Sequence, residues 1–160
     1  MNKRNIFVTL ECFIQKDGKY LMLHRSSKKK IMPGVWMAPG GKREFNEGLF
    51  ECARREVFEE TGLTIKNLRI KATGCAYLKD LDEEFFFHFV FADYAGGELK
   101  PSDEGELQWL APKEIGKLDN VLAEIKVMLP YLFKNDEQLY SFKVEYEKGN
   151  KLNSFLLEES

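Results

Sequence analysis

Paired cysteines, long apolar runs and a large excess of either charge are all absent from this 160-residue sequence. The three cysteines, Cys12, Cys52 and Cys75, are far apart and form no Cys-x-x-Cys pair, which argues against a disulfide framework and a zinc site. No apolar run approaches the length that spans a membrane, and Glu11 and Lys16 interrupt the amino-terminal stretch that briefly resembles a signal peptide. We therefore expect a cytoplasmic protein without a membrane partner.

The charge balance is nearly neutral, with 24 basic and 26 acidic side chains and a formal net charge of −2. Proteins that coat nucleic acid polymers are normally basic, so this balance argues against such a partner and leaves a small anionic ligand as the alternative. The hydrophobic fraction of 44% indicates a globular chain. Because no repeat, linker or low-complexity tract divides the sequence, we expect residues 1–160 to form one domain of unknown oligomeric state.

Apolar alternation and turn signals predict several strands and at least two helices. The predicted strands cover residues 5–14, 20–24, 65–77, 85–93, 106–110, 139–146 and 152–157. The predicted helices cover residues 47–61, a short segment opened by Pro112, and residues 121–133, which Pro130 interrupts late. For the first helix we expect Asn46 as the N-cap, Glu47 in the first turn and Gly62 at the end.

The fold class follows from the order and character of these elements. Residues 85–91 carry phenylalanine at every second position with further apolar residues between, which predicts a sheet covered on both faces. The elements follow one another without a regular βαβ rhythm. We therefore expect an α/β (α+β) fold, with a mixed sheet sandwiched between helices.

The helix predicted over residues 47–61 carries acidic side chains close to its apolar stripe. That stripe consists of Leu49, Ala53 and Val57. Glu56 and Glu60 fall within or beside it, and Glu59 borders it. An acid-rich helix face is most often simply solvated, but here repulsion and desolvation would both disfavour the three charges. A divalent cation with oxygen ligands resolves that conflict, and Mg²⁺ suits a site that also receives phosphate oxygens.

Residues 41–63 also match a known sequence pattern at every specified position. The pattern is glycine, five residues, glutamate, seven residues, then Arg-Glu-apolar-x-Glu-Glu-x-Gly-apolar. The matching residues are Gly41, Glu47, Arg55, Glu56, Val57, Glu59, Glu60, Gly62 and Leu63. A chance match in one window has a probability on the order of 10⁻⁹. The chain is therefore identified as a member of the Nudix hydrolase superfamily, which implies the Nudix fold and attack of a metal-activated water on a polyphosphate.

The resemblance implies roles for individual residues. It implies Mg²⁺, with Mn²⁺ as a substitute, bound by the side chains of Glu56, Glu59 and Glu60 and the backbone carbonyl of Gly40. Arg55 would orient the glutamates by charge-assisted hydrogen bonds. On an ideal helix Glu47 would lie about half a turn around the axis from Glu56, on the opposite side. It would therefore support these groups without binding metal.

A carboxylate must also take the proton from the attacking water. Relatives use either a glutamate of the box or one from a later loop. The later candidate here is Glu104, which is also a candidate metal ligand, and Glu106 is a weaker contender. A solvated acidic turn is the alternative interpretation of Glu104.

Segments outside the box resemble the MutT-type branch of the superfamily, the 8-oxo-dGTP diphosphatases. Residues 34–36 followed by 39–42 look like that branch's approach to the box, and Trp109 resembles its downstream tryptophan. The hairpin predicted over residues 139–157 is similar to the ending of its bacterial members. This resemblance implies hydrolysis of a nucleoside triphosphate, including an oxidised one such as 8-oxo-dGTP, to the monophosphate and pyrophosphate.

The base-reading residues of the vertebrate members are not reproduced here. Those members carry an asparagine after the tryptophan of the approach and an Asp-Asp pair downstream, whereas this chain has Met37 and no such pair near residues 121–130. The substrate-binding candidates are Arg25, Lys42, Gly41, Met37 and Thr9. Further aromatic candidates, each of which also suits a core, are Phe7, Phe87 and Trp109. Residues 28–30, three lysines in a row, could meet a triphosphate, although a solvated basic loop is the expected use for most of them.

Other functions stay open at this point. One alternative is hydrolysis of a different nucleoside diphosphate derivative, such as a nucleotide sugar or a dinucleoside polyphosphate. The lack of proline between Leu63 and Pro101 argues against ADP-ribose as the substrate, and Tyr77 falls slightly early for the dinucleoside polyphosphate enzymes. The second alternative is a non-catalytic Nudix module that senses a nucleotide. The complete set of glutamates favours the enzyme.

Overall fold

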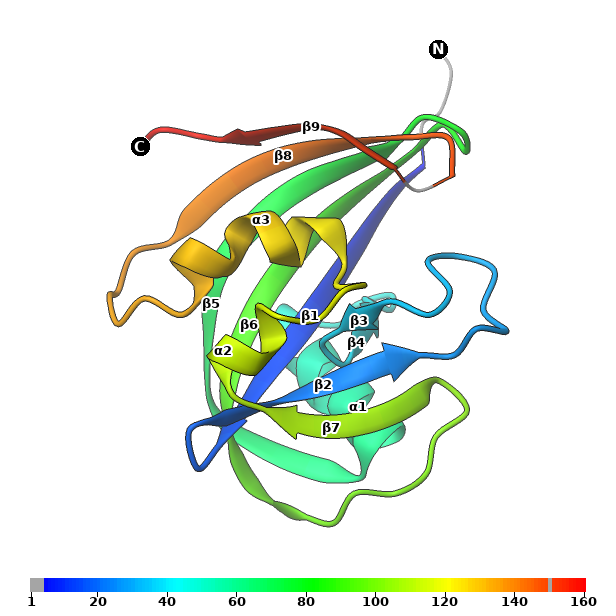
Figure 1. Ribbon diagram of the computed structural model, residues 1–160. Helices are drawn as coiled ribbons and strands as arrows, with labels where there is room; N and C mark the ends of the chain where they lie inside the picture. The colour runs from blue at the N-terminus through cyan, green and yellow to red at the C-terminus, as the bar shows by residue number, and fades with distance from the viewer. Residues whose placement is uncertain (1–4, 150) are drawn as a thin grey trace.

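The computed structural model describes residues 5–149 and 151–160, and these residues form one nine-stranded sheet with three helices (Figure 1). The strands are β1 (Ile6–Lys16), β2 (Lys19–Arg25), β3 (Trp36–Met37), β4 (Gly40–Lys42), β5 (Leu63–Leu78), β6 (Glu83–Gly97), β7 (Gly105–Leu110), β8 (Tyr140–Glu147) and β9 (Lys151–Leu157). The helices are α1 (Leu49–Thr61), α2 (Pro112–Ile115) and α3 (Ala123–Leu132). Among the described residues, none of the helices is long and apolar enough to cross a membrane.

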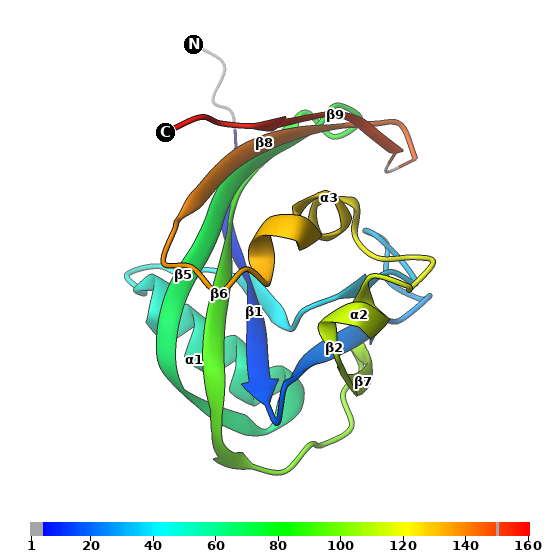
Figure 2. The same ribbon diagram turned by 60° about the vertical axis from the view of Figure 1, so that its left-hand side comes forward.

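The sheet is mixed, as the sequence predicts. Its main order is β3-β2-β1-β6-β5-β8-β9, with β4 paired to β1 and β7 paired to β2. β1 runs parallel to β6, and β5 runs parallel to β8, while the remaining pairs are antiparallel. Helix α1 packs on one face of the sheet and α3 on the other (Figure 2). The expected α+β sandwich is therefore confirmed.

Strand β1 carries one apolar core on each of its faces, because successive side chains of a strand point to opposite sides. Leu10, Cys12 and Ile14 pack with the buried residues of α1. Phe13, between them in sequence, packs with the phenylalanines of β6 and the buried residues of α3. The alternation also places Glu11 on the same face as Phe13, where it is only 6% exposed.

The prediction that the sheet is covered on both faces holds for only part of β6. Val90 and Ala92 are buried beneath α1, opposite Phe89 and Phe91 on the other face. Phe86, nearer the start of the strand, is 38% exposed. Helix α1 covers only the later part of β6, so the first residues on that face remain open.

The sheet forks along β1, and this fork opens the space that holds the site. The segment Thr9–Glu11 pairs with β4, whereas Gln15 and Lys16 pair with β2. At the fork β4 lies so close to β1 that a Cβ on Gly40 would stand 2.0 Å from the backbone oxygen of Leu10. Only glycine permits this approach.

Helix α1 begins two residues later than the sequence predicts. Asn46 is not the N-cap: it adopts a left-handed conformation (φ 57°), and Gly48 is the residue that precedes the helix. The carboxylate of Glu51 accepts the backbone N–H of Gly48, so a first-turn acid caps the helix. Glu47 therefore lies ahead of the helix and not in its first turn. The predicted ending is confirmed, with Gly62 at φ 80°.

Other boundaries differ by a few residues. Helix α3 spans ten residues and not residues 121–133, because Val121 and Leu122 are extended and bonded to Trp36 of β3. Pro130 lies within α3, near its end. Residues 34–42, where no strand was predicted, contain β3 and β4. The terminal hairpin of β8 and β9 is confirmed, although Asn150 of its predicted turn lies outside the described residues.

Candidate functional site

A cavity of about 520 Å³ lies at the fork along β1, and residues of β1 and β4 line it. Its walls come from distant parts of the chain: the acids of α1, the loop after β2, the turn before β7, and residues of α3 and β8. It brings together nine of the residues predicted from the sequence, namely Thr9, Arg25, Met37, Gly40, Gly41, Lys42, Glu56, Glu60 and Glu104. Phe87 of the aromatic candidates also lines it.

Glu60 is the most strongly perturbed acid of α1. Burial raises its pKa to about 8, and repulsion from Glu56 and Glu104 adds to this. The backbone N–H of Gly40 donates to Glu60 Oε2 at 3.1 Å, which joins the last turn of α1 to β4. The carboxyl group is therefore held at the cavity wall in an environment that disfavours its negative charge.

Glu56 lies one turn earlier on α1 and directly beside Gly41. A Cβ on Gly41 would stand 2.5 Å from the Glu56 carboxyl carbon, so glycine leaves the room that this carboxylate occupies. Burial raises the pKa of Glu56, against the opposing effect of Arg55. The paired glycines of β4 thus admit both acids to the same edge of the cavity.

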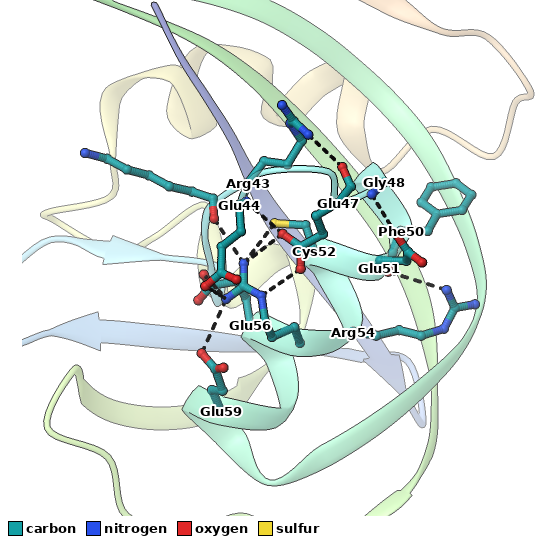
Figure 3. Close-up of polar contacts among 12 residues, drawn as sticks. Arg43, Glu44, Glu47, Gly48, Phe50, Glu51, Cys52, Arg54, Glu56 and Glu59 are labelled. Carbon is teal, nitrogen blue, oxygen red and sulfur yellow. Dashed lines mark hydrogen bonds and ion pairs between the residues drawn. The ribbon is translucent and has the colours of Figure 1, made fainter.

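Arg55 connects three acids of the box, Glu47, Glu56 and Glu59, which are labelled in Figure 3. Its guanidinium donates to both oxygens of Glu47, at 2.7 and 3.0 Å, and to Glu56 Oε1 at 2.8 Å. It also reaches the backbone oxygen of Lys42 at 3.1 Å and, more weakly, Glu59 Oε2 at 3.4 Å. These bonds fix the rotamer of Glu56, as the predicted orienting role requires.

Glu47 supports the box from a different place than the sequence predicts. It precedes α1, and the backbone N–H of Glu44 donates to it at 2.9 Å. The hydrogen bonds from Arg55 hold the pKa of Glu47 down, to about 2. The carboxylate therefore stays ionised and stabilises the Arg55 cation, and it does not line the cavity among the described residues.

Glu59 and Glu104 are each paired with a cation. The side chain of Glu59 is 58% exposed and lies against Arg55. Glu104 Oε1 accepts a hydrogen bond from Lys29 at 2.8 Å, and Arg25 lies 3.9 Å from its other oxygen. A solvated loop is the expected use of most of the basic residues in this segment, whereas Lys29 forms an ion pair with Glu104.

Three polar residues that line the cavity escaped the sequence analysis. Glu11 accepts the backbone N–H of Ala38 at 3.2 Å, and burial raises its pKa well above the usual range. Glu124 of α3 and Tyr146 of β8 meet each other in a hydrogen bond. The sequence does contain a signal for Glu11, since it is the single charge inside the apolar stretch of residues 5–14.

The other predicted aromatic candidates belong elsewhere. Trp109 packs on the α1 side of the sheet, and Phe7 packs against Phe85 with the ammonium of Lys42 above the Phe7 ring at 4.0 Å. Glu106 is exposed on β7, paired across from His24. None of these three lines the cavity among the residues described.

The donor set fits a divalent cation. Glu56 and Glu60 offer oxygen ligands at one edge of the cavity, and both carry raised pKa values that a nearby positive charge would lower. Within residues 5–149 and 151–160, no three acidic, histidine or cysteine side chains are already gathered closely enough to hold an ion. The ion pairs of Glu59 and Glu104 with neighbouring cations explain why they stand apart.

This arrangement is that of a Nudix hydrolase, and comparison with known proteins agrees. The NUDIX domain model matches residues 8–132, so the chain belongs to the Nudix family. Nudix enzymes hydrolyse nucleoside diphosphate derivatives and generally use a divalent metal ion, typically Mg²⁺.

The similar proteins include MutT-type members. YvcI of Bacillus subtilis, described as an uncharacterized Nudix hydrolase, is 37% identical over 111 residues, which cover 67% of each chain. NudI of Escherichia coli, described as a nucleoside triphosphatase, is 28% identical over 140 residues, 80% of this chain and 96% of NudI. A solved mutator MutT protein from Bacillus halodurans has a TM-score of 0.82 and 28% identity, covering 95% of this chain and 97% of its own.

Proposed function

We propose that this Nudix hydrolase converts a nucleoside triphosphate to the monophosphate and pyrophosphate, and that oxidised guanine nucleotides such as 8-oxo-dGTP are among its substrates. The observation that carries the proposal is the composition of the cavity. One edge is formed by the carboxylates of α1 with basic residues close by, and the remaining walls are largely apolar. A polyphosphate suits the first and a base suits the second. The name of NudI, a nucleoside triphosphatase, supports the same class of substrate.

The roles of the metal-binding residues are part of the proposal. Glu56, Glu59 and Glu60, with the backbone carbonyl of Gly40, would hold Mg²⁺ or, in its place, Mn²⁺. When bound, the cation supplies charge neutralisation and lowers the pKa of a water molecule near the scissile phosphorus. To bind the metal, the carboxylate of Glu59 must leave Arg55. Their contact is weak, with 3.4 Å between Arg55 Nη1 and Glu59 Oε2 on an exposed surface.

Two groups at the cavity are suited to accept the proton of the attacking water. Glu60 is held at the cavity edge by the Gly40 N–H, where its carboxylate can accept a proton. Glu104 lies across from it on the turn before β7, and the two are close enough to repel each other. Either carboxylate can accept the proton, and Glu104 can do so once Lys29 has released it.

The basic groups of the rim are suited to the phosphates. Arg25, at the end of β2, donates through Nε to the backbone oxygen of Ile31 and so is held at the cavity wall. Lys42 follows the two glycines of β4 and lines the same wall. Met37 and Thr9 line the cavity too, on β3 and β1, and would contact the nucleoside. We further propose that the whole chain, residues 1–160, is a single Nudix domain.

A panel of nucleotides tests the substrate assignment. Purified protein with Mg²⁺ is incubated with the common dNTPs, 8-oxo-dGTP, a nucleotide sugar and a dinucleoside polyphosphate, and pyrophosphate and orthophosphate are assayed separately. We expect pyrophosphate from the triphosphates, with a higher kcat/KM for 8-oxo-dGTP than for dGTP. Turnover of only the nucleotide sugar or dinucleoside polyphosphate would contradict the proposal. Tight nucleotide binding without any turnover would favour a sensing module.

A further inference from the structure

Two carboxylates hold the short link between β3 and β4. Ala38 and Pro39 form this link, and both are buried. The backbone N–H of Ala38 donates to Glu11 Oε1 at 3.2 Å, and that of Gly40, the first residue of β4, donates to Glu60 Oε2 at 3.1 Å. Because proline has no N–H, these two side chains accept both backbone donors of residues 38–40.

The two carboxylates come from opposite sides of the sheet. Glu11 belongs to β1 and lies on the face that packs with α3, whereas Glu60 belongs to α1 on the other face (Figure 2). Both nevertheless line the same cavity, since the fork along β1 opens the sheet between them. The link between β3 and β4 is therefore held from both sides.

The pairing of β1 with β4 determines where the backbone of Gly40 points. Glu11 and Gly40 are direct partners in this antiparallel pair, and the next N–H along β1, that of Cys12, donates to the Pro39 carbonyl at 2.7 Å. Hydrogen-bonded and non-hydrogen-bonded positions alternate along such a pair, so Gly40 occupies a non-hydrogen-bonded position. Its N–H and C=O therefore both point away from β1, on the side where Glu60 accepts the N–H.

Glu11 is a costly residue at its position. It lies in the middle of β1, is 6% exposed, and shares its face with the fully buried Phe13. Burial, with repulsion from Glu124 and Glu60, raises its pKa well above the usual range. No lysine or arginine makes an ion pair with it among the described residues. The Ala38 N–H is the donor that offsets this cost.

The link depends on such bonds because its residues have little else to hold them. Ala38 offers only a methyl group for packing, and Gly40 has no side chain. An apolar residue at position 11 would avoid burying a carboxyl group but would leave the buried Ala38 N–H without its acceptor, which costs free energy and frees the link to shift. The acceptor supplied by Glu11 therefore constrains the backbone that leads into Gly40.

We propose that Glu11 is a positioning residue for the metal site, which fixes the direction of the Gly40 carbonyl by holding the Ala38 N–H. This inference rests on the proposed metal ligands Gly40 and Glu60, and it adds a residue that lies outside the box and on the opposite face of the sheet. Glu11 acts through the link and does not itself bind the cation. Side chains that orient metal ligands in this way typically contribute about 10- to 100-fold to metal affinity or activity.

Metal binding in the absence of nucleotide tests the inference without catalysis. Titration with Mn²⁺, followed by the electron paramagnetic resonance signal of the free ion, gives the Kd. Glu11→Leu removes the acceptor with a side chain of similar size and should raise the Kd by about 10-fold or more. Glu11→Gln should keep the wild-type Kd, because its amide oxygen can accept the same N–H. Glu11→Asp keeps the charge but is one methylene too short for Ala38, so it should resemble Glu11→Leu.

Phe13→Leu is the control for a general loss of stability. Phe13 is fully buried two positions further along β1, on the same face, and its ring accepts no hydrogen bond from the link. This variant should melt at a lower temperature than the wild type and bind Mn²⁺ equally well. Thermal melting of each variant checks folding, and Glu11→Asp keeps the test available if Glu11→Leu does not fold.

The outcomes separate this inference from the proposed function. Wild-type Mn²⁺ affinity in Glu11→Leu and Glu11→Asp, or an equal loss in Glu11→Gln or Phe13→Leu, would overturn the inference. Absence of Mn²⁺ binding by the wild type would overturn it together with the proposed metal ligands. A wild-type protein that binds Mn²⁺ but hydrolyses no triphosphate would overturn only the proposed function, because metal affinity is measured separately.

Discussion

At the scale of single residues, the site depends on how each carboxylate is partnered. Glu47 has a lowered pKa because Arg55 holds it, whereas Glu60 has a pKa of about 8 because burial outweighs its one backbone hydrogen bond. A glutamate is therefore a stable anion at position 47, whereas at position 60 its negative charge needs a nearby cation. The difference lies in the surroundings and is invisible in the box pattern itself.

Replacement of the box acids should abolish turnover while leaving the fold intact. Glu60→Gln and Glu59→Gln each remove a proposed metal ligand, so kcat should fall by several orders of magnitude, on the order of 10³-fold. Steady-state kinetics with Mg²⁺ and circular dichroism check the two parts of this expectation. Arg54→Gln, on the exposed side of α1, should retain the wild-type rate. A Glu60→Gln enzyme with near-normal kcat would show that the metal site has been misassigned.

The guanidinium of Arg55 can be tested by a second substitution. Arg55→Lys keeps the charge but cannot bond Glu47 with two nitrogens while also holding Glu56, so kcat should fall by about 10- to 100-fold. The apparent Mg²⁺ affinity, from a metal titration of activity, should weaken in parallel. Glu44→Gln is the matched control, because Glu44 is 68% exposed and 3.7 Å from Arg55. Unchanged kinetics in Arg55→Lys would rule out the orienting role.

At the scale of elements, the short strand β4 determines where α1 can place its acids. Gly40 and Gly41 let the strand lie against β1 and against Glu56 at distances that no side chain tolerates. The sequence did not predict this strand, because a three-residue strand has too few residues to show alternation.

Gly41→Ala should disturb the site more than the fold. Its Cβ would stand 2.5 Å from the carboxyl carbon of Glu56, so this side chain must move away from the cavity edge. We expect a marked loss of kcat and of Mg²⁺ affinity with a small change in melting temperature. Gly116→Ala provides the control, since its φ is −62° and the nearest atom would be 3.7 Å from the new Cβ. Wild-type activity in Gly41→Ala would contradict the proposed role of Glu56.

The connection between α3 and β8 is fastened by Lys71 of β5. Its ammonium donates to the carboxylate of Asp136 and to the backbone oxygens of Lys134 and Asp136, and the Tyr140 hydroxyl donates to the same carboxylate. These bonds to the ionised form lower the pKa of Asp136. A depressed folded-state pKa stabilises the fold above the ordinary aspartate pKa, and this contribution disappears as the pH falls through the lowered value.

Asp136→Asn should therefore lower the melting temperature at pH 7, and the difference from wild type should shrink as the pH falls below the ordinary aspartate pKa near 4. Thermal melts over this pH series provide the measurement. Asp119→Asn, an exposed residue outside this cluster, should show no such pH-dependent difference. A constant difference between Asp136→Asn and wild type at every pH would contradict the proposed ionic contribution.

At the scale of the whole molecule, much of the fold could be predicted because its periodic segments are long. The sheet class, α1 and the terminal hairpin follow from alternation and turn signals in the sequence. The start of α1 was misplaced because Asn46 has the side chain of a cap, while the bonds of Glu47 to Arg55 and Glu44 hold this segment outside the helix. Local propensity cannot show a contact of that kind.

Only part of the candidate site could be predicted from the sequence. The acids of α1 and the glycines of β4 lie within one short segment, so a pattern finds them. Glu124 and Tyr146 are 22 residues apart and belong to different elements. They meet only because the sheet brings β8 beside β5 and α3 packs across that face. Residues that assemble through tertiary packing leave little trace in a single sequence.

The pairing of Lys29 with Glu104 has a consequence for how the protein responds to its ionic surroundings. A polyphosphate that engages Lys29 must take it from Glu104, so one ion pair replaces another at that point. Dissolved ions then weaken the ion pair that breaks and the ion pair that forms by similar amounts, because both are screened over about 8–10 Å at physiological salt. Affinity for a non-hydrolysable triphosphate analogue should therefore fall only gently as NaCl is raised. Glu104→Gln, which frees Lys29 beforehand, should bind more tightly at low salt and lose affinity more steeply; equal slopes in the two proteins would show that Lys29 takes no part.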